Sequence, residues 1–140
     1  MGYIIGFDYG LKNIGVSIGQ TITRTASEQP SFKARDGIPN WQELEDLFKE
    51  WQPDYIVIGL PLNMDGSESD LCARVKKFAN RIHGRFGLKV ELMDERLSTR
   101  EAKQQASERG HKGDYGQNPI DAIAARLILE SWLNQHHIDE

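Results

Sequence analysis

The stretch that most constrains this chain is residues 3–10, an apolar β-type run that ends at one carboxylate, Asp8. A second β-type run, residues 14–20, follows after a connection of hairpin length. A strand that is apolar on both faces belongs in the middle of a sheet that is covered on both sides. A carboxylate there is costly unless it lies at the end of the strand, in a cleft, with a partner. We therefore expect Asp8 to belong to a functional site.

Length and composition indicate one domain, spanning residues 1–140, with a core of ordinary size. No apolar run approaches the roughly 20 residues of a membrane span, and no signal-peptide pattern precedes the first strand. The single cysteine, Cys72, excludes an internal disulfide and a cysteine-based zinc cluster. We expect a cytoplasmic protein.

Charge is unevenly distributed along the chain. The formal net charge is −4, yet residues 71–112 carry 11 Lys and Arg against 5 Asp and Glu. Such asymmetry indicates either a basic binding surface on an acidic body or a solvated helix face that happens to be basic. Charge alone leaves both interpretations open.

Periodicity predicts an α/β chain in the order β-β-β-α-β-α-β-α-α. The strands are expected at residues 3–9, 14–20, 21–26, 54–60 and 88–94. Helices are expected between Asn40 and Pro53 and at residues 69–86, 98–108 and 118–134. Residues 27–38 are expected to be irregular, and residues 109–117 to form a glycine-rich loop. This order predicts a mixed sheet with helices on both faces.

The helix at 69–86 is amphipathic. One stripe is apolar, and the other carries Arg74, Lys77, Arg81 and Arg85. We expect this basic stripe to contact backbone phosphates if the partner is a long nucleic acid. Trp41 and Trp51 lie in an apolar helical stripe and are expected in the core rather than as base-stacking platforms.

Carboxylates stand at three places where a strand ends or a helix begins. They are Asp8, the pair Asp94 and Glu95, and Asp121. If the first strand and the strand at 88–94 are neighbours, a helix starting near 119 brings a third carboxylate beside them. Three carboxylates this close repel one another unless a cation is present, and their oxygen ligands suit Mg²⁺ or Mn²⁺. Two ions about 4 Å apart activate a water for phosphodiester hydrolysis.

Each acid also has a structural interpretation. Asp121 lies three residues after the expected N-cap, Asn118, where an acid serves the capping box and the helix dipole. Asp94 or Glu95 could pair with Arg96 or Arg100 on a rim. Strand alternation places Asp94 and Glu95 on opposite faces but does not decide which of them shares a face with Asp8. The four histidines are scattered and suggest no catalytic pair.

Four motifs together resemble the YqgF family. They are FDYG at 7–10, GLPLNMDG at 59–66, DERLST at 94–99, and the helix start at Asp121. Members of that family are described as Holliday junction resolvases and as nucleases acting on precursor 16S ribosomal RNA. The resemblance implies a ribonuclease H-like fold with a five-stranded mixed sheet. It also implies that Asp8, Glu95 and Asp121 are the catalytic metal ligands, which favours Glu95 over Asp94. Related resolvases of the RuvC type use four acids, whereas three clear positions occur here.

Several further residues are candidates for substrate binding. Lys12, Arg96 and Arg100 are close enough in sequence to the acids to hold phosphate oxygens. Asn63 could line the substrate groove or simply help to turn the chain. The resemblance favours an rRNA precursor over branched DNA. A junction resolvase would need a two-fold dimer, and we expect a monomer or a weak homodimer.

Two other classes of protein compete with a nuclease. Asp8-Tyr9-Gly10 followed by a hairpin is similar to the first phosphate loop of sugar-kinase-type phosphotransferases, and a second Asp-x-Gly occurs at residues 114–116. That second motif lies in a loop, and the chain is short for two ATP-clamping lobes. A non-catalytic RNA- or ribosome-associated module, binding through the basic helix, is the other alternative.

Overall fold

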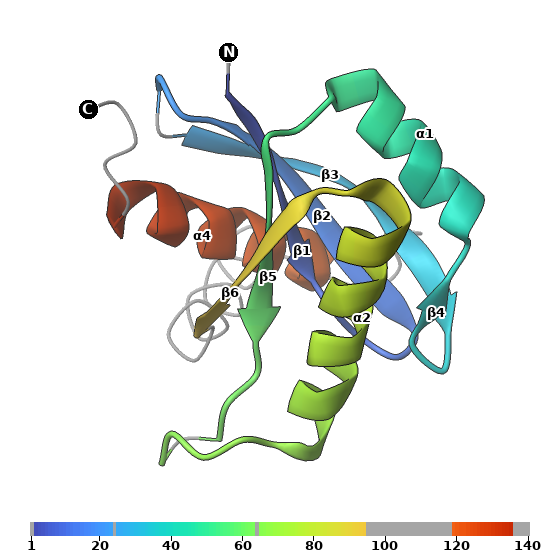
Figure 1. Ribbon diagram of the computed structural model, residues 1–140. Coiled ribbons are helices and arrows are strands. Elements are labelled where there is room, and N and C mark those ends of the chain that lie inside the picture. The colour runs from blue at the N-terminus through green and yellow to red at the C-terminus, as the bar shows by residue number, and fades with distance from the viewer. Residues whose placement is uncertain (1, 24, 64, 95–118, 136–140) are drawn as a thin grey trace.

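The chain is built on one six-stranded sheet (Figure 1). The computed structural model describes residues 2–23, 25–63, 65–94 and 119–135, with the backbone alone at 119–122 and 135. The predicted helix at 98–108 and loop at 109–117 lie outside these residues. The strand order is β4-β3-β2-β1-β5-β6. The strands are β1 (Tyr3–Asp8), β2 (Asn13–Gln20), β3 (Thr25–Arg35), β4 (Ile38–Pro39), β5 (Tyr55–Leu60) and β6 (Lys89–Asp94).

Helices cover both faces of the sheet, as predicted. On one face lie α1 (Trp41–Trp51) and α2 (Asp70–Phe86), and on the other lies α4 (Pro119–Gln135). The predicted N-cap of α1 is confirmed, because Asn40 Oδ1 accepts the backbone N–H of Gln42 at 2.9 Å. Gly87 ends α2 in the left-handed conformation that favours glycine. None of the helices described is long and apolar enough to cross a membrane.

The position predicted for the third strand is wrong. The strand is β3, residues 25–35, which occupies most of the stretch predicted to be irregular, and β4 raises the count from five to six. β3 was missed because it is polar and partly exposed and contains Pro30. The register of β2 and β3 shifts between Ile14 and Val16, opposite residues 29–32. Such a bulge is a place where a strand tolerates proline.

A second correction concerns the neighbours of β1. The sequence led us to consider the strand at 88–94 as adjacent to the first strand, but β5 lies between β1 and β6. Phe7 pairs with Ile58, and Ile58 pairs with Leu92, in parallel ladders. The two acid-bearing strand ends are therefore two strand spacings apart, about 10 Å.

Alternate residues of β1 fill two separate cores. Ile5 and Phe7 pack with α1 and α2, whereas Ile4 packs with Ile128 and Leu129 of α4. The prediction that both tryptophans belong to the core is confirmed. The Trp51 ring lies 5.3 Å from that of Tyr3, and the Trp41 ring lies 6.1 Å from that of Phe78.

The α4 helix approaches the sheet most closely at Gly6. A Cβ at this position would lie 2.7 Å from Ser17 Oγ, 3.0 Å from Leu129 Cβ and 3.2 Å from the Ala125 carbonyl oxygen. Ser17 is fully buried, and its hydroxyl donates to that carbonyl at 2.8 Å. Glycine at position 6 and a hydrogen-bonding serine at position 17 therefore fix how α4 lies on the sheet.

The substitution Gly6→Ala should destabilise the protein by about 1–3 kcal/mol, because the added methyl group overpacks the contact between α4 and the sheet. The control is Gly84→Ala on the exposed side of α2, where nothing lies within 4 Å of a Cβ. This control should be stabilising by about 0.5–1 kcal/mol. Urea unfolding measures both changes, and equal stability of the two variants would contradict the close contact.

Candidate nuclease site

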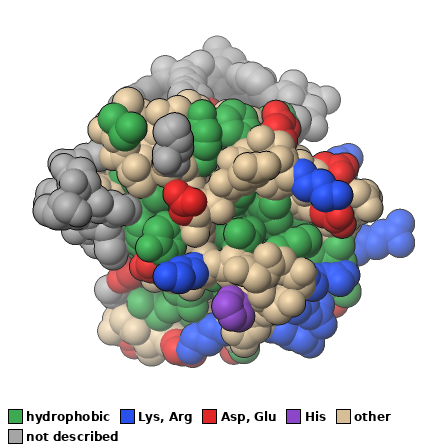
Figure 2. All heavy atoms as spheres, turned by 45° about the horizontal axis from the view of Figure 1, so that its top comes forward, with side chains coloured by type: hydrophobic (Ala, Val, Ile, Leu, Met, Phe, Trp, Pro, Cys, Tyr) green, Lys and Arg blue, Asp and Glu red, His purple; other side chains and the backbone are tan. Residues whose placement is uncertain are grey.

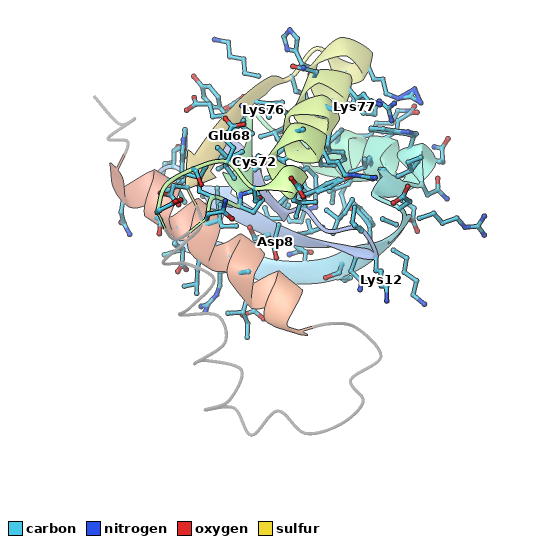
Figure 3. The ribbon with its side chains drawn as sticks, turned by 90° about the horizontal axis from the view of Figure 1, so that it is seen from below. Asp8, Lys12, Glu68, Cys72, Lys76 and Lys77 are labelled. Carbon is cyan, nitrogen blue, oxygen red and sulfur yellow. The ribbon has the colours of Figure 1, made fainter. Side chains whose placement is uncertain are left out.

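Asp8 ends β1 on the face of the sheet that α4 covers. Side chains alternate along a strand, so Asp8 shares a face with Ile4 and Gly6, both of which lie against α4. The residue is half-buried. Figure 3 shows Asp8 at the edge of the sheet where the sheet meets α4. This is the placement that the sequence predicted, at a strand end and beside a covering helix.

Glycines flank Asp8 on both neighbouring strands. Gly15 is its partner on β2. On the other side, Phe7 pairs with Ile58, and the same register brings Gly59 of β5 beside Asp8. Neither neighbour has a side chain, which leaves space around the carboxylate for an ion or a phosphate oxygen. Sequence reasoning missed this pair, although glycine inside a strand often marks a close approach of a ligand.

The faces of β6 separate Asp94 from Asp8. Met93 packs in the core beneath α4, and Glu91 Oε1 accepts the indole N–H of Trp132 at 3.1 Å. Val90 packs in the core on the other face. Asp94 follows Met93 and shares the face of Val90, opposite to that of Asp8. Strand alternation alone did not show whether Asp94 shares a face with Asp8, and the structure shows that it does not. Glu95 lies outside the described residues.

Contacts along α4 bring its first turn towards Asp8. A Cβ at Gly19 would meet Leu129 and Leu133, and a Cβ at Gly6 would meet Ala125 and Leu129. Gly19 pairs with Ile4. A move of two residues along β1, from Ile4 to Gly6, thus matches a move of about one helical turn towards the beginning of α4. Two strand residues and one helical turn each span roughly 6 Å. A further two residues along β1 lead from Gly6 to Asp8, and a further turn of α4 leads from Ala125 to Asp121. The backbone of Asp121 therefore lies near the end of β1 that carries Asp8.

Lys12 lies on the exposed loop between β1 and β2. The loop is held to β3 and to the following turn, because the Lys12 carbonyl accepts the N–H of Ala34 at 2.8 Å and the Leu11 carbonyl accepts that of Gly37 at 2.9 Å. Figure 3 shows Lys12 on the same side of the molecule as Asp8. The other two cations expected to hold phosphate, Arg96 and Arg100, lie outside the described residues.

The loop that contains Asn63 is tightly folded upon itself. Asn63 Nδ2 donates to Ser67 Oγ at 3.0 Å, and its backbone N–H donates to the Ser67 carbonyl at 2.8 Å. Ser69 Oγ donates to the Pro61 carbonyl at 2.6 Å. The Asn63 amide therefore has a structural role in turning the chain. A contact between Asn63 and substrate stays a prediction.

The described side chains alone do not complete a metal site. Among them, no group of three or more His, Cys, Asp or Glu residues is arranged to hold an ion. Two of the three predicted ligands, Glu95 and the side chain of Asp121, fall outside that set. The structure thus places Asp8 and the backbone of Asp121 and leaves the complete ligand set as a prediction.

Solved structures define the class of fold. RuvC of Thermus thermophilus in complex with a Holliday junction substrate aligns with a TM-score of 0.56 at 11% identity, over 98% of each chain. The Fowlpox virus resolvase, in complex with Holliday junction DNA, aligns with a TM-score of 0.55 at 16% identity, over 95% of this chain and 97% of that one. The chain therefore has the ribonuclease H-like fold of the resolvases, as the motifs implied.

Sequence comparison then gives the family. The model of the RuvX family, described as Holliday junction resolvase, matches residues 2–135, and the chain belongs to that family. A relative from Saccharophagus degradans is 60% identical over 133 residues, 95% of this chain and 94% of the relative. One from Sodalis glossinidius is 58% identical over 134 residues, covering 96% and 95%. Both carry the name "Putative pre-16S rRNA nuclease". RuvX is another name for the YqgF family, so the resemblance seen in the four motifs is confirmed.

Proposed function

We propose that this protein is a metal-dependent endonuclease that hydrolyses phosphodiester bonds in precursor 16S ribosomal RNA. The observation that carries the proposal is the setting of Asp8, a carboxylate at the end of a buried strand, flanked by two glycines and approached by the beginning of α4. The names of the relatives at 52–60% identity support the RNA substrate. The cytoplasmic location that we expected from the sequence is part of this proposal.

The proposed ligands are Asp8, Glu95 and Asp121. Asp94 faces away from Asp8, which supports the choice of Glu95, the acid that the family resemblance favours. Three carboxylates form a hard oxygen donor set that fits Mg²⁺ or Mn²⁺, and the glycines beside Asp8 leave room for an ion. When bound, two such ions supply a water of lowered pKa and neutralise charge on the phosphate and the leaving oxygen.

The chain's own cations position the substrate in this proposal. Lys12 extends from a loop fixed by two backbone hydrogen bonds, on the same side of the molecule as Asp8. Arg96 and Arg100 follow β6 closely in sequence and would reach phosphate oxygens near the acids. Such contacts position the strand without reading its sequence.

Cleavage of branched DNA is the second candidate function. The description of the family model and the two junction-bound structural relatives favour it. Symmetric cutting of a junction requires two active sites related by a two-fold axis, and therefore a dimer. A monomer acting on one RNA strand needs no such partner.

The substitution Asp8→Asn should reduce cleavage of a labelled precursor rRNA fragment by more than about 100-fold, because it removes a charged ligand from the metal site. The assay is run with Mn²⁺ and with EDTA, next to a four-way DNA junction. Metal-dependent cutting of RNA alone, lost in the variant, supports the proposal. Paired cuts in the junction would instead establish a resolvase, and RNA binding without cutting would establish a non-catalytic module.

Two adjacent acids provide an internal control. Glu95→Gln should abolish cleavage as completely as Asp8→Asn, whereas Asp94→Asn should retain activity within about tenfold of the unmodified protein, because Asp94 faces away from Asp8. In calorimetric titration, Glu95→Gln should weaken the binding of Mn²⁺, whereas Asp94→Asn should leave it nearly unchanged. The reverse order of the two variants would refute the proposed ligand set.

A further inference from the structure

A basic pocket lies on the face of the sheet opposite to Asp8. Its volume is about 360 Å³, and it lies between α2 and the turn that joins β3 to β4. Its charged lining is Arg74, Lys77, Arg81 and Asp36. Lys and Arg side chains also gather on one side of the face shown in Figure 2. The pocket is large enough for one nucleotide, since pockets for small ligands begin at about 300 Å³.

Two of the three cations in the pocket are available to an anion. Arg74 Nη1 donates to Asp36 Oδ1 at 3.2 Å and to the Asp36 carbonyl at 2.9 Å, so Arg74 is engaged in holding the turn. Lys77 and Arg81 are exposed and form no ion pair within the part of the chain that the structure describes. Cations concentrated in a concave site attract and hold phosphate.

The walls of the pocket are fixed before any ligand binds. The Tyr9 hydroxyl donates to the Gly37 carbonyl at 2.7 Å. Gly37 has a φ of +82°, and a Cβ there would collide with the Tyr9 hydroxyl. At the rim, the Ile38 side chain is 53% exposed and offers an apolar surface to a base.

The pocket and the acid site share one edge of the sheet. Tyr9 follows Asp8 in the chain and points to the other face. The loop that carries Lys12 begins after Asp8 and is hydrogen-bonded to the turn at Gly37, so this loop adjoins the pocket. In Figure 3, Asp8 lies at the sheet between Lys77, which is on α2, and Lys12, which is on the other side of Asp8. A strand cut at Asp8 can therefore continue around the end of β1, past Tyr9, into the pocket.

We propose that this pocket binds one unpaired nucleotide of the RNA strand, away from the scissile bond. Lys77 and Arg81 hold its phosphate, and the base rests against Ile38. A single strand fits better than a duplex, because a base must leave the helical stack to enter a pocket of this size. This proposal rests on the proposed nuclease function and extends its substrate contact to a second site.

The test is binding of a fluorescent single-stranded RNA oligonucleotide, measured by anisotropy in EDTA so that no cleavage occurs. The double variant Lys77→Ala/Arg81→Ala should bind at least tenfold more weakly. The salt dependence of its binding should be shallower by about 0.7 in slope for each lost phosphate contact. The control Lys49→Ala/Lys89→Ala changes net charge equally away from the pocket and should weaken binding less than threefold.

A third variant, Ile38→Ser, tests the apolar rim without changing charge. It should weaken binding of the oligonucleotide and leave the salt slope unchanged. Circular dichroism spectra are used to check that each variant is folded. Equal loss in the pocket and control double variants would show an effect of bulk charge and overturn the proposal. So would tighter binding of duplex RNA, or binding of a free mononucleotide as tight as that of the oligonucleotide.

The binding test is independent of catalysis. If the protein holds RNA through this pocket and yet cuts neither RNA nor junction, the nuclease proposal fails and the pocket stands. If cleavage depends on Asp8 but the double variant binds RNA normally, the pocket proposal fails and the nuclease stands.

Discussion

The contact between α4 and the sheet at Gly6 is the constraint on which the site depends. Only a residue without a side chain allows the helix backbone to approach β1 so closely, and the buried Ser17 hydroxyl fixes the position of α4 by donating to the Ala125 carbonyl. Asp121 precedes that carbonyl by one helical turn, and Asp8 follows Gly6 by one strand repeat. The same contact therefore sets the spacing of two proposed ligands that are more than a hundred residues apart in sequence. A small error there would separate the carboxylates from a shared ion.

The two faces of the sheet have different tasks. On the α4 face, Asp8 lies between Gly15 and Gly59, where small neighbours leave room for an ion and a phosphate. On the other face, aromatic packing around Phe78 supports the wall of the basic pocket. Asp8 and Tyr9 are adjacent in the chain, and strand alternation alone sends them to these two environments. One strand end thus connects the proposed chemistry to the proposed RNA contact.

Much of this arrangement could be predicted from the sequence, and the exceptions have physical causes. The apolar run ending at Asp8 and the capping residue Asn40 are local signals, and both predictions are confirmed. β3 was misplaced because its polar residues and Pro30 give no alternating pattern, and its pairing with β2 is a long-range property. The position of β5 between β1 and β6 likewise depends on the whole sheet. The flanking glycines and the face of Asp94 became visible only with the register.

The most direct test of the central claim is an anomalous difference map from crystals soaked in Mn²⁺. The proposed ligand set predicts a peak at the end of β1, within coordination distance of Asp8, with Glu95 and Asp121 completing the site. A peak coordinated by Asp94 in place of Glu95, or the absence of manganese beside Asp8 in crystals of protein that cleaves RNA, would contradict it.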